Sequence, residues 1–294
     1  MAPSKLKVWI AAARPRTLPA AVGPVVIGAA MAYDDACFDV PVLAMTFLAA
    51  LLIQIGTNLA NDYYDFVKGA DKVDRVGPVR ATQAGLVTPA QMKAAFLLTF
   101  AAAALTGLYL VARGGLPIFI IGAASLACAV LYTAGPFPLA YVGLGEVFVL
   151  PFFGPIAVGG TYYLQCGQIK PDVLIAGLAP GLLSVAILAV NNFRDIDADR
   201  AAGKKTLAVR FGFRFGVAEY ITCVVIACLV PIYIALTRRA NYGACLALVT
   251  LAAAIFPIRT VLSRPAPAVL NEVLAQTGKL LLLYSVLFSV GWLL

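Results

Sequence analysis

Half of the acidic residues in this 294-residue sequence lie in two short segments, residues 58–85 and 191–212. Each segment opens with asparagines, continues with aspartates and then supplies lysines and arginines. Histidine is absent from the sequence, which removes the usual zinc ligand and the most common general base. Any chemistry in these segments must therefore rest on carboxylates, amides and cations. Clusters of oxygen ligands of this kind suit Mg²⁺.

The first segment places its oxygen ligands on one face of a predicted helix. At about 100° per residue, Asn58, Asn61 and Asp65 fall within one narrow arc, and Asp62 lies at its flank. We interpret Asn61 and Asp65 as metal ligands, and Asn58 as a further candidate. The remaining candidates of this segment are Asp62, Asp71 and Asp74.

The second segment carries a matching row of oxygen ligands, and we call each of these two rows a ladder. Asn191, Asp195 and Asp199 form an i, i+4, i+8 stripe on one helix face. Asp197 points to the far side of the same helix, so we expect it to face solvent. The stripe predicts a second set of metal ligands.

Two facing ladders would bring several carboxylates within a few ångströms of one another. Like charges that close cannot all stay ionised without cations. Mg²⁺ binds a few carboxylates and completes its shell with water and substrate phosphates. The basic residues that follow the ladders suit an anion such as a diphosphate, and they are Lys68, Lys72, Arg75, Arg80, Arg200, Lys204 and Lys205. The pattern therefore predicts a metal–diphosphate site.

The alternative explanation is a pair of solvated loops, because carboxylates and lysines often face water at the ends of membrane helices. A single aspartate would fit that explanation, but two matching ladders do not, since ionisable groups at membrane depth are usually functional. For Asp62, Asp71 and Asp74 both explanations remain open.

The composition places these ladders in a membrane protein. The sequence is 62% hydrophobic and 12% charged, whereas a soluble domain carries about 25% charged residues. Nine apolar stretches approach the length of a membrane-spanning helix. They are residues 17–33, 41–61, 92–112, 116–134, 142–163, 172–193, 215–236, 242–262 and 276–294. We predict one all-α domain over residues 1–294, with nine transmembrane helices bundled around a central cavity.

The basic residues predict the orientation. When the loops are assigned alternately to two sides, 18 of the 22 Lys and Arg residues share the side of the N-terminus. The positive-inside rule makes this side cytoplasmic. Both acidic segments fall on this side, so we expect a bacterial cytoplasmic-membrane protein whose site faces the cytoplasm. The net charge of +8 is thus a topology signal, and we expect no nucleic-acid partner.

The ladders also suggest an internal duplication. They end the second and sixth predicted helices, which run in the same direction, so the chain resembles a repeated four-helix unit with a ninth helix added.

An ion-coupled transporter is the alternative from another functional class. It would place ionisable residues at the bilayer midplane, commonly within inverted repeats.

Three other features are noted in the predicted helices and their ends. Tyr132 is the aromatic residue we single out for stabilising a carbocation through its π face. Glu146 lies within a predicted span, facing either an aromatic pocket or the bundle interior. Cys37 and Cys166 both fall near the outer side, and whether they pair stays open.

The residues resemble the UbiA superfamily of intramembrane aromatic prenyltransferases. The similarity lies in NDYYD (Asn61–Asp65), the set Asn191, Asp195 and Asp199, RPRTL (Arg14–Leu18) and GKKTLAVRFG (Gly203–Gly212). Within the superfamily the menaquinone branch is most similar, through DRVGPVRATQAG (Asp74–Gly85), YTAGPFP (Tyr132–Pro138) and NNFRDIDADR (Asn191–Arg200). Gly69 followed by Asp71, in place of an aspartate at 69, also fits this branch.

The resemblance implies a reaction and roles. Two Mg²⁺ ions would bind a polyprenyl diphosphate, and the ions would be held by Asn61, Asp65, Asn191, Asp195 and Asp199. Membrane lipid would surround the prenyl tail. Diphosphate-binding residues would be Lys68, Arg75, Arg80 and Lys205, and catalytic ones Asp65, Asp195, Asp199, Lys204 and Tyr132. Attack by 1,4-dihydroxy-2-naphthoate on the allylic cation, with loss of CO₂, would give demethylmenaquinol. The alternative acceptors are 4-hydroxybenzoate and homogentisate.

Overall fold

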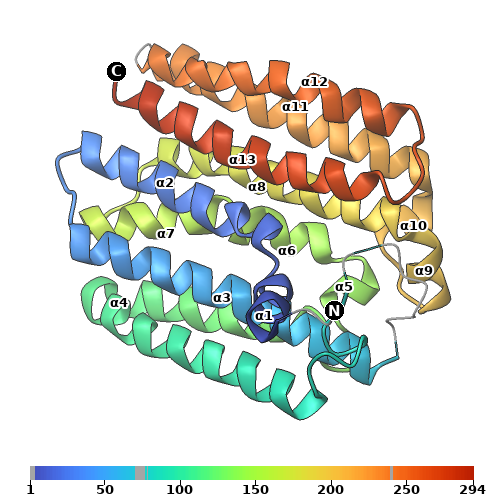
Figure 1. The fold of residues 1–294 in the computed structure, drawn as a ribbon. Coiled ribbons are helices and arrows are strands. Elements are labelled where there is room, and N and C mark those ends of the chain that lie inside the picture. The colour runs from blue at the N-terminus through green and yellow to red at the C-terminus, as the bar shows by residue number, and fades with distance from the viewer. Residues whose placement is uncertain (1–3, 70–76, 78, 239–240) are drawn as a thin grey trace.

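Every regular element in the described part of the chain is helical, which confirms the predicted all-α class. The computed structural model describes residues 4–69, 77, 79–238 and 241–294 (Figure 1). The first half contains α1 (Lys5–Ala13), η1 (Pro15–Thr17), α2 (Pro19–Asp34), α3 (Val40–Val67), α4 (Pro89–Leu131), α5 (Leu139–Val142), α6 (Gly145–Phe152) and α7 (Pro155–Cys166). The second half contains α8 (Pro171–Arg194), α9 (Ile196–Ala201), α10 (Leu207–Phe211), α11 (Phe213–Arg238), η2 (Tyr242–Leu248), α12 (Val249–Leu262) and α13 (Leu270–Trp292).

The predicted membrane spans coincide with helices. Within the described residues, seven helices are long and apolar enough to cross a membrane, or eight if the bent pair Lys5–Thr17 and Pro19–Asp34 forms one span. The 43-residue helix α4 contains two of the predicted spans. Gly115 interrupts it between them with a φ of 65°, a backbone conformation that glycine adopts without steric cost.

The helix starts follow from local sequence. Asp39 caps α3 by accepting a hydrogen bond from the backbone N–H of Val42 at 3.1 Å. Thr88 and Gln91 form a reciprocal capping box at the start of α4. Pro89 takes the first helical position, where its missing N–H costs nothing.

Helix α8 lies at the centre of the bundle. It packs against α2, α6, α7, α11 and α13, and most of its side chains are buried. A Cβ on Gly177 of α8 would lie 2.7 Å from the Cα of Pro155, so glycine permits the close crossing with α7. The helix that carries the second ladder is therefore firmly held.

Two of the three apolar clusters of the described residues concern the helices around the site. The larger one is built mainly from α8, α11 and α13, and includes Tyr162, Tyr220 and Phe288. The smaller one joins α1, α3 and α4 through residues such as Leu59 and Phe96. The main cavity is lined by residues of α2, α3, α4, α6, α7 and α8, and so by helices from both clusters.

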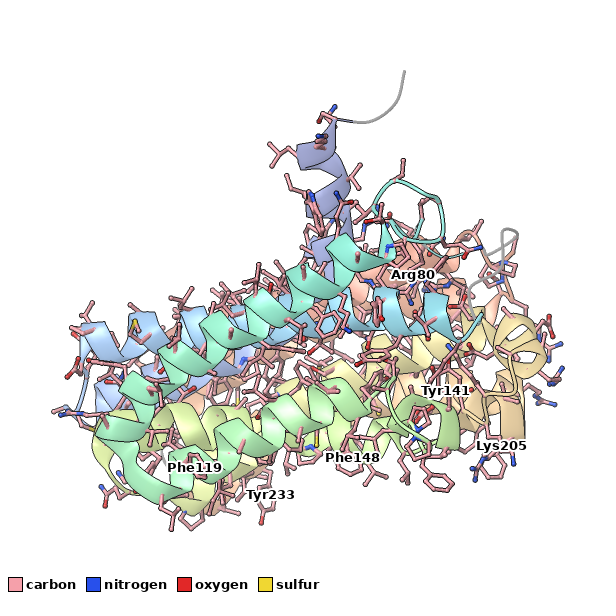
Figure 2. The ribbon with its side chains drawn as sticks, turned by 90° about the horizontal axis from the view of Figure 1, so that it is seen from below. Arg80, Phe119, Tyr141, Phe148, Lys205 and Tyr233 are labelled. Carbon is pink, nitrogen blue, oxygen red and sulfur yellow. A yellow bond between two sulfur atoms is a disulfide. The ribbon has the colours of Figure 1, made fainter. Side chains whose placement is uncertain are left out.

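The two ends of the bundle differ in character. The short helices α5, α9 and α10 gather at the end near the N-terminus, whereas the C-terminus lies at the opposite end (Figure 1). Arg80, Tyr141 and Lys205 lie toward the first end, and Phe119 and Tyr233 toward the other (Figure 2).

A disulfide joins Cys37 to Cys166 in this structure. It connects the α2–α3 turn, at the end of the bundle away from α5, α9 and α10, to the last residue of α7. The pairing that the sequence left open is therefore present, and it lies far from both acidic ladders.

Candidate active site

The first ladder lies in the last two turns of α3 and is buried. The carboxylate of Asp65 accepts a hydrogen bond from Arg80 at 2.9 Å and another from the Tyr141 hydroxyl at 3.0 Å. One turn earlier, the Asn61 amide oxygen accepts a hydrogen bond from the Thr133 hydroxyl at 2.9 Å. A buried carboxylate is costly unless it is paired and hydrogen-bonded, and these contacts meet that requirement for Asp65.

The second ladder lies where α8 gives way to α9. Asp195 sits at the break between the two helices. Arg194 donates to both of its carboxylate oxygens, at 2.7 and 2.6 Å, and to the Asn191 amide oxygen at 2.8 Å. A further guanidinium N–H of Arg194 donates to Asn271 of α13 at 3.0 Å. Arg194 therefore orients two ladder residues at once.

Lys204 joins the two ladders. Its Nζ lies 3.3 Å from a carboxylate oxygen of Asp199 and 3.9 Å from one of Asp65. The backbone N–H of Lys204 also donates to the Asp199 carbonyl at 2.9 Å, which closes the turn after α9. Residues more than 130 positions apart in the sequence thus share one cation.

The carboxylates are separated by protein cations. In the part of the chain that the structure describes, no three Asp, Glu or Cys side chains lie together closely enough to share a metal ion. The sequence-based expectation of several carboxylates in direct proximity is therefore not met, because Arg80, Arg194 and Lys204 lie among them. These cations compensate the buried negative charge.

The residues nevertheless fit a hard cation. Side chains of both ladders line the same cavity, namely Asn61, Asp65, Asn191, Asp195 and Asp199. Their donor atoms are carboxylate and amide oxygens, the set that Mg²⁺ accepts, and no histidine or thiolate competes among them. Arg80 and Lys204 line this cavity too, so positive charge is present beside the oxygen donors.

Lys68 lies at the same end of the bundle but is held by backbone carbonyls. Its Nζ donates to the Thr133 and Gly135 carbonyls at 2.7 and 3.3 Å, and lies 4.8 Å from the centroid of the Tyr141 ring. Burial lowers the pKa of Lys68, an effect opposed by Asp65. Lys205 has an exposed side chain, and its backbone N–H donates to the Tyr141 carbonyl at 2.7 Å.

Two candidate ligands of the first segment have structural partners instead. The carboxylate of Asp62 accepts hydrogen bonds from the backbone N–H groups of Ala81 and Thr82, at 3.0 and 3.1 Å. It thereby anchors the loop that carries Arg80. The Asn58 amide donates to the Ala13 carbonyl and the Thr17 hydroxyl, at 3.0 and 3.1 Å, although Asn58 also lines the cavity.

The remaining candidates are one surface residue and four residues outside the described part of the chain. Asp197 is a surface residue, with its side chain 92% exposed and 3.5 Å from Arg200, as expected for a residue facing away from the ladder. Asp71, Asp74, Lys72 and Arg75 lie outside the described residues.

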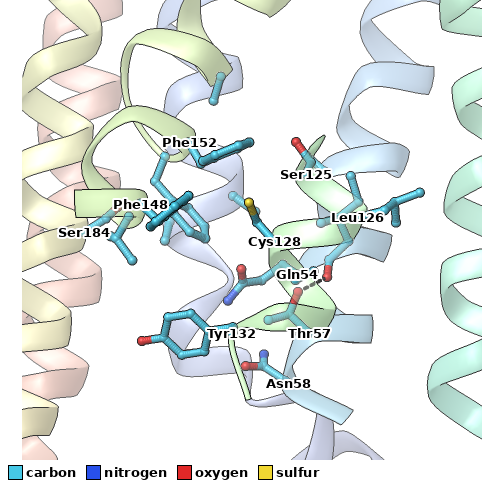
Figure 3. Close-up of a pocket in the computed structure, with 18 of the residues that line it drawn as sticks. Gln54, Thr57, Asn58, Ser125, Leu126, Cys128, Tyr132, Phe148, Phe152 and Ser184 are labelled. Carbon is cyan, nitrogen blue, oxygen red and sulfur yellow. Dashed lines mark hydrogen bonds between the residues drawn. The ribbon is translucent and has the colours of Figure 1, made fainter. Parts of the chain in front are cut away.

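A cavity of about 580 Å³ extends from the ladders between the helices. Its walls are mainly apolar and include Tyr132, Phe148 and Phe152 (Figure 3). Phe153 also lines it. A long apolar space with polar groups concentrated at one end matches an amphipathic ligand with an anionic head. Tyr132, selected from the sequence, is part of this wall.

Sequence reasoning missed several residues of the site. Arg194 pairs with Asp195, and the Tyr141 hydroxyl donates to Asp65, but neither residue was among the predicted site residues. Thr133 and Asn192, which line the cavity, were not predicted either. The adjacency of Arg194 to Asp195 was the available signal for one of them, but it does not reveal that the two side chains pair.

Comparisons with known proteins agree with this geometry. The UbiA prenyltransferase family matches residues 21–293. The 1,4-dihydroxy-2-naphthoate octaprenyltransferase of Escherichia coli (strain K12) is 37% identical over 98% of this chain and 96% of that protein. The protein of the same name from Mycobacterium tuberculosis (strain ATCC 25618 / H37Rv) is 44% identical over 69% of this chain and 70% of its own.

A solved structure has the same fold. The UbiA homologue from Archaeoglobus fulgidus bound to GPP and Mg²⁺ superposes with a TM-score of 0.65, at 14% identity, over 96% of this chain and 99% of that one. The family match over almost the whole sequence and the relatives at 37% and 44% identity lead to one conclusion. The chain belongs to the UbiA prenyltransferase family and is a multi-pass membrane enzyme.

Proposed function

We propose that this protein transfers a polyprenyl group from polyprenyl diphosphate to 1,4-dihydroxy-2-naphthoate, releasing diphosphate and CO₂ and giving demethylmenaquinol. The observation that carries the proposal is 37% identity, over 98% of the chain, to a 1,4-dihydroxy-2-naphthoate octaprenyltransferase. Two oxygen ladders line the polar end of an apolar cavity together with Arg80 and Lys204, and they supply the matching chemistry.

The polar end of the cavity would bind the diphosphate. We assign two Mg²⁺ ions to Asn61, Asp65, Asn191, Asp195 and Asp199, and when bound they supply positive charge that stabilises the leaving group. Arg80 and Lys204 line the same space and would bind the diphosphate oxygens. Lys68 lies close by and adds positive charge at this end. Lys205 and Arg75 stay further candidates for the same role.

The apolar part of the cavity would hold the prenyl chain and the acceptor ring. Breaking the C–O bond of the allylic diphosphate leaves a carbocation, which the π faces of Tyr132 and Phe148 can stabilise. A ring carbon of the naphthoate then forms the new C–C bond. Departure of CO₂ returns its bonding electrons to the ring and restores aromaticity. The apolar walls would limit the access of water to the cation.

The orientation in the membrane completes the proposal. Nine spans, with the N-terminus and both ladders on the cytoplasmic side of a bacterial membrane, account for the distribution of 18 of 22 basic residues. Reporter fusions at residues 92 and 205 should both be cytoplasmic, and a fusion after Leu294 should be external. Placement of the first two on opposite sides would refute the shared site.

An acceptor panel tests the proposed reaction. Purified protein in detergent, with Mg²⁺ and a polyprenyl diphosphate, should prenylate 1,4-dihydroxy-2-naphthoate and leave 4-hydroxybenzoate and homogentisate unchanged. Products are identified by mass spectrometry, with a heat-inactivated sample as the control. Conversion of 4-hydroxybenzoate alone would keep the family but refute the menaquinone assignment.

A further inference from the structure

Glu146 is a buried carboxylate that the proposed reaction does not use. It lies in the first turn of α6 and is 9% exposed. Within the described residues, its side chain receives one hydrogen bond from another residue, from the Asn192 amide Nδ2 to Oε1 at 2.8 Å. Ionisable groups inside membrane proteins are costly to bury and usually mark a functional site. Glu146 therefore requires an explanation beyond packing.

A neighbouring cation does not explain how the Glu146 carboxylate is buried. No lysine or arginine of the described residues lies within ion-pairing distance of Glu146, in contrast to Asp65, Asp195 and Asp199. Glu146 thus differs from the ladder carboxylates, whose partners are cations.

The partner of Glu146 faces the cavity. Asn192 is 6% exposed, lies next to the ladder residue Asn191 on α8, and lines the cavity. The Asn192 NH₂ group donates to Oε1 of Glu146, so this hydrogen bond turns the NH₂ side of the amide toward Glu146. The amide oxygen of Asn192 is then the atom left for the cavity, and no hydrogen bond to it occurs among the described residues.

The surroundings of this pair fit an aromatic ring. A Cβ on Gly145 would lie 3.4 Å from the Tyr132 hydroxyl oxygen, so this tyrosine packs directly against the residue before Glu146. Phe148, two residues after Glu146 in α6, and Tyr132 both line the cavity (Figure 3). The cavity wall here thus combines aromatic surfaces with one hydrogen-bond acceptor.

We propose that the amide oxygen of Asn192 accepts a hydrogen bond from a ring hydroxyl of the aromatic acceptor, and that Glu146 is the positioning residue that holds this amide in the required orientation. This inference rests on the proposed function, because it needs a hydroxylated aromatic substrate. A buried polar group that pairs with a substrate hydroxyl discriminates strongly against analogues that lack it. The pair would therefore contribute to acceptor specificity and leave prenyl diphosphate binding unaffected.

The test compares the two substrates in the same variants. In Asn192→Leu and Glu146→Leu, KM for 1,4-dihydroxy-2-naphthoate should rise about tenfold, the loss expected for one hydrogen bond in a buried site. KM for the prenyl diphosphate should stay within about twofold of the wild-type value. Glu146→Gln retains a hydrogen-bond acceptor for Asn192 and should recover most of the affinity. Gln165→Leu is the matched control.

The control removes a buried amide at the opposite end of the bundle. Gln165 is also 6% exposed and exchanges hydrogen bonds with the backbone of Asp39 at 2.6 and 3.1 Å. It does not line the cavity. Gln165→Leu should therefore change neither KM, which separates the loss of a buried amide in general from the loss of the Asn192 amide.

Substrate analogues complete the test and do not depend on any variant folding. Wild-type protein should bind at least one of 1-hydroxy-2-naphthoate and 4-hydroxy-2-naphthoate about tenfold more weakly than the dihydroxy compound. Asn192→Leu should not weaken binding of that analogue further. Equal changes in the KM values for the naphthoate and the prenyl diphosphate would overturn the inference about Asn192 and Glu146 but not the proposed function. Equal binding of all three naphthoates by the wild-type protein would do the same. Absence of any naphthoate product with wild type would overturn the proposed function as well.

Discussion

Lys204 shows how single residues balance charge at the meeting point of the ladders. It contacts carboxylates of both, at 3.3 Å from Asp199 and 3.9 Å from Asp65, and its Nζ lies 4.9 Å from the centroid of the Tyr141 ring. Buried carboxylates would repel one another without such cations. The same positive charge suits the diphosphate that we propose binds here.

The contrast between two neighbouring aspartates provides a prediction at this scale. Asp199→Ala should lower kcat by about 10³-fold, because losing a metal ligand removes several kcal/mol of charge stabilisation from the departing diphosphate. Asp197→Ala should stay within about twofold of wild type, since its side chain is 92% exposed. Steady-state turnover at saturating Mg²⁺ distinguishes them, and equal losses in both variants would refute the assigned ladder.

At the scale of elements, the loop before α4 is positioned by Asp62. This carboxylate binds two successive backbone N–H groups, those of Ala81 and Thr82, next to Arg80. Fixing the loop directs the Arg80 guanidinium to Asp65 at 2.9 Å. Asp62 therefore holds Arg80 in place beside Asp65.

Substitution of Asp62 should consequently affect binding and stability together. Asp62→Ala leaves two buried N–H groups without an acceptor, and we expect KM for the prenyl diphosphate to rise several-fold with a lower unfolding temperature. Asp62→Asn retains one acceptor oxygen and should be intermediate. Kinetics and thermal unfolding of the purified proteins measure both effects. An unchanged KM in a destabilised Asp62→Ala protein would show that Arg80 does not depend on this loop.

The same elements show what the sequence could predict. Apolar length correctly predicted an all-helical membrane protein, but the described residues contain seven or eight candidate spans where nine were predicted. Asn191, Asp195 and Asp199, grouped by their i, i+4, i+8 spacing, do line one cavity. The partners of Asp62 and Asp195 were missed, because they depend on loop conformation and on side-chain geometry at a helix break. Periodicity describes the face of a helix, whereas these contacts form where the helices end.

The disulfide gives a prediction for the opposite end of the bundle. Cys37→Ser together with Cys166→Ser should lower the unfolding temperature, since the bond closes a sequence separation of 129 residues. The value of kcat should remain within about twofold, because neither residue lines the cavity. Thiol labelling of the denatured wild-type protein should modify four of its six cysteines before reduction and all six afterwards. Labelling of all six without reductant would contradict the pairing.

At the scale of the whole molecule, two distant segments of the sequence converge on one polar end of an apolar cavity. Helix α3 belongs to one side of the bundle and α8 to its centre, and Lys204 makes contact with residues of both ladders. We expect the two ladders to work as a single site. If they do, removing a ligand from either should disable the same step.

A double-mutant comparison tests whether the two ladders form one site. Turnover of polyprenyl diphosphate and 1,4-dihydroxy-2-naphthoate is measured at saturating Mg²⁺ for Asp65→Asn, Asp195→Asn and the double variant. Each single change should cost about 10²-fold in kcat, and the double variant should lose about the same, because residues that act as a unit are strongly non-additive. A double loss near 10⁴-fold, or a single variant with close to full activity, would contradict the shared site.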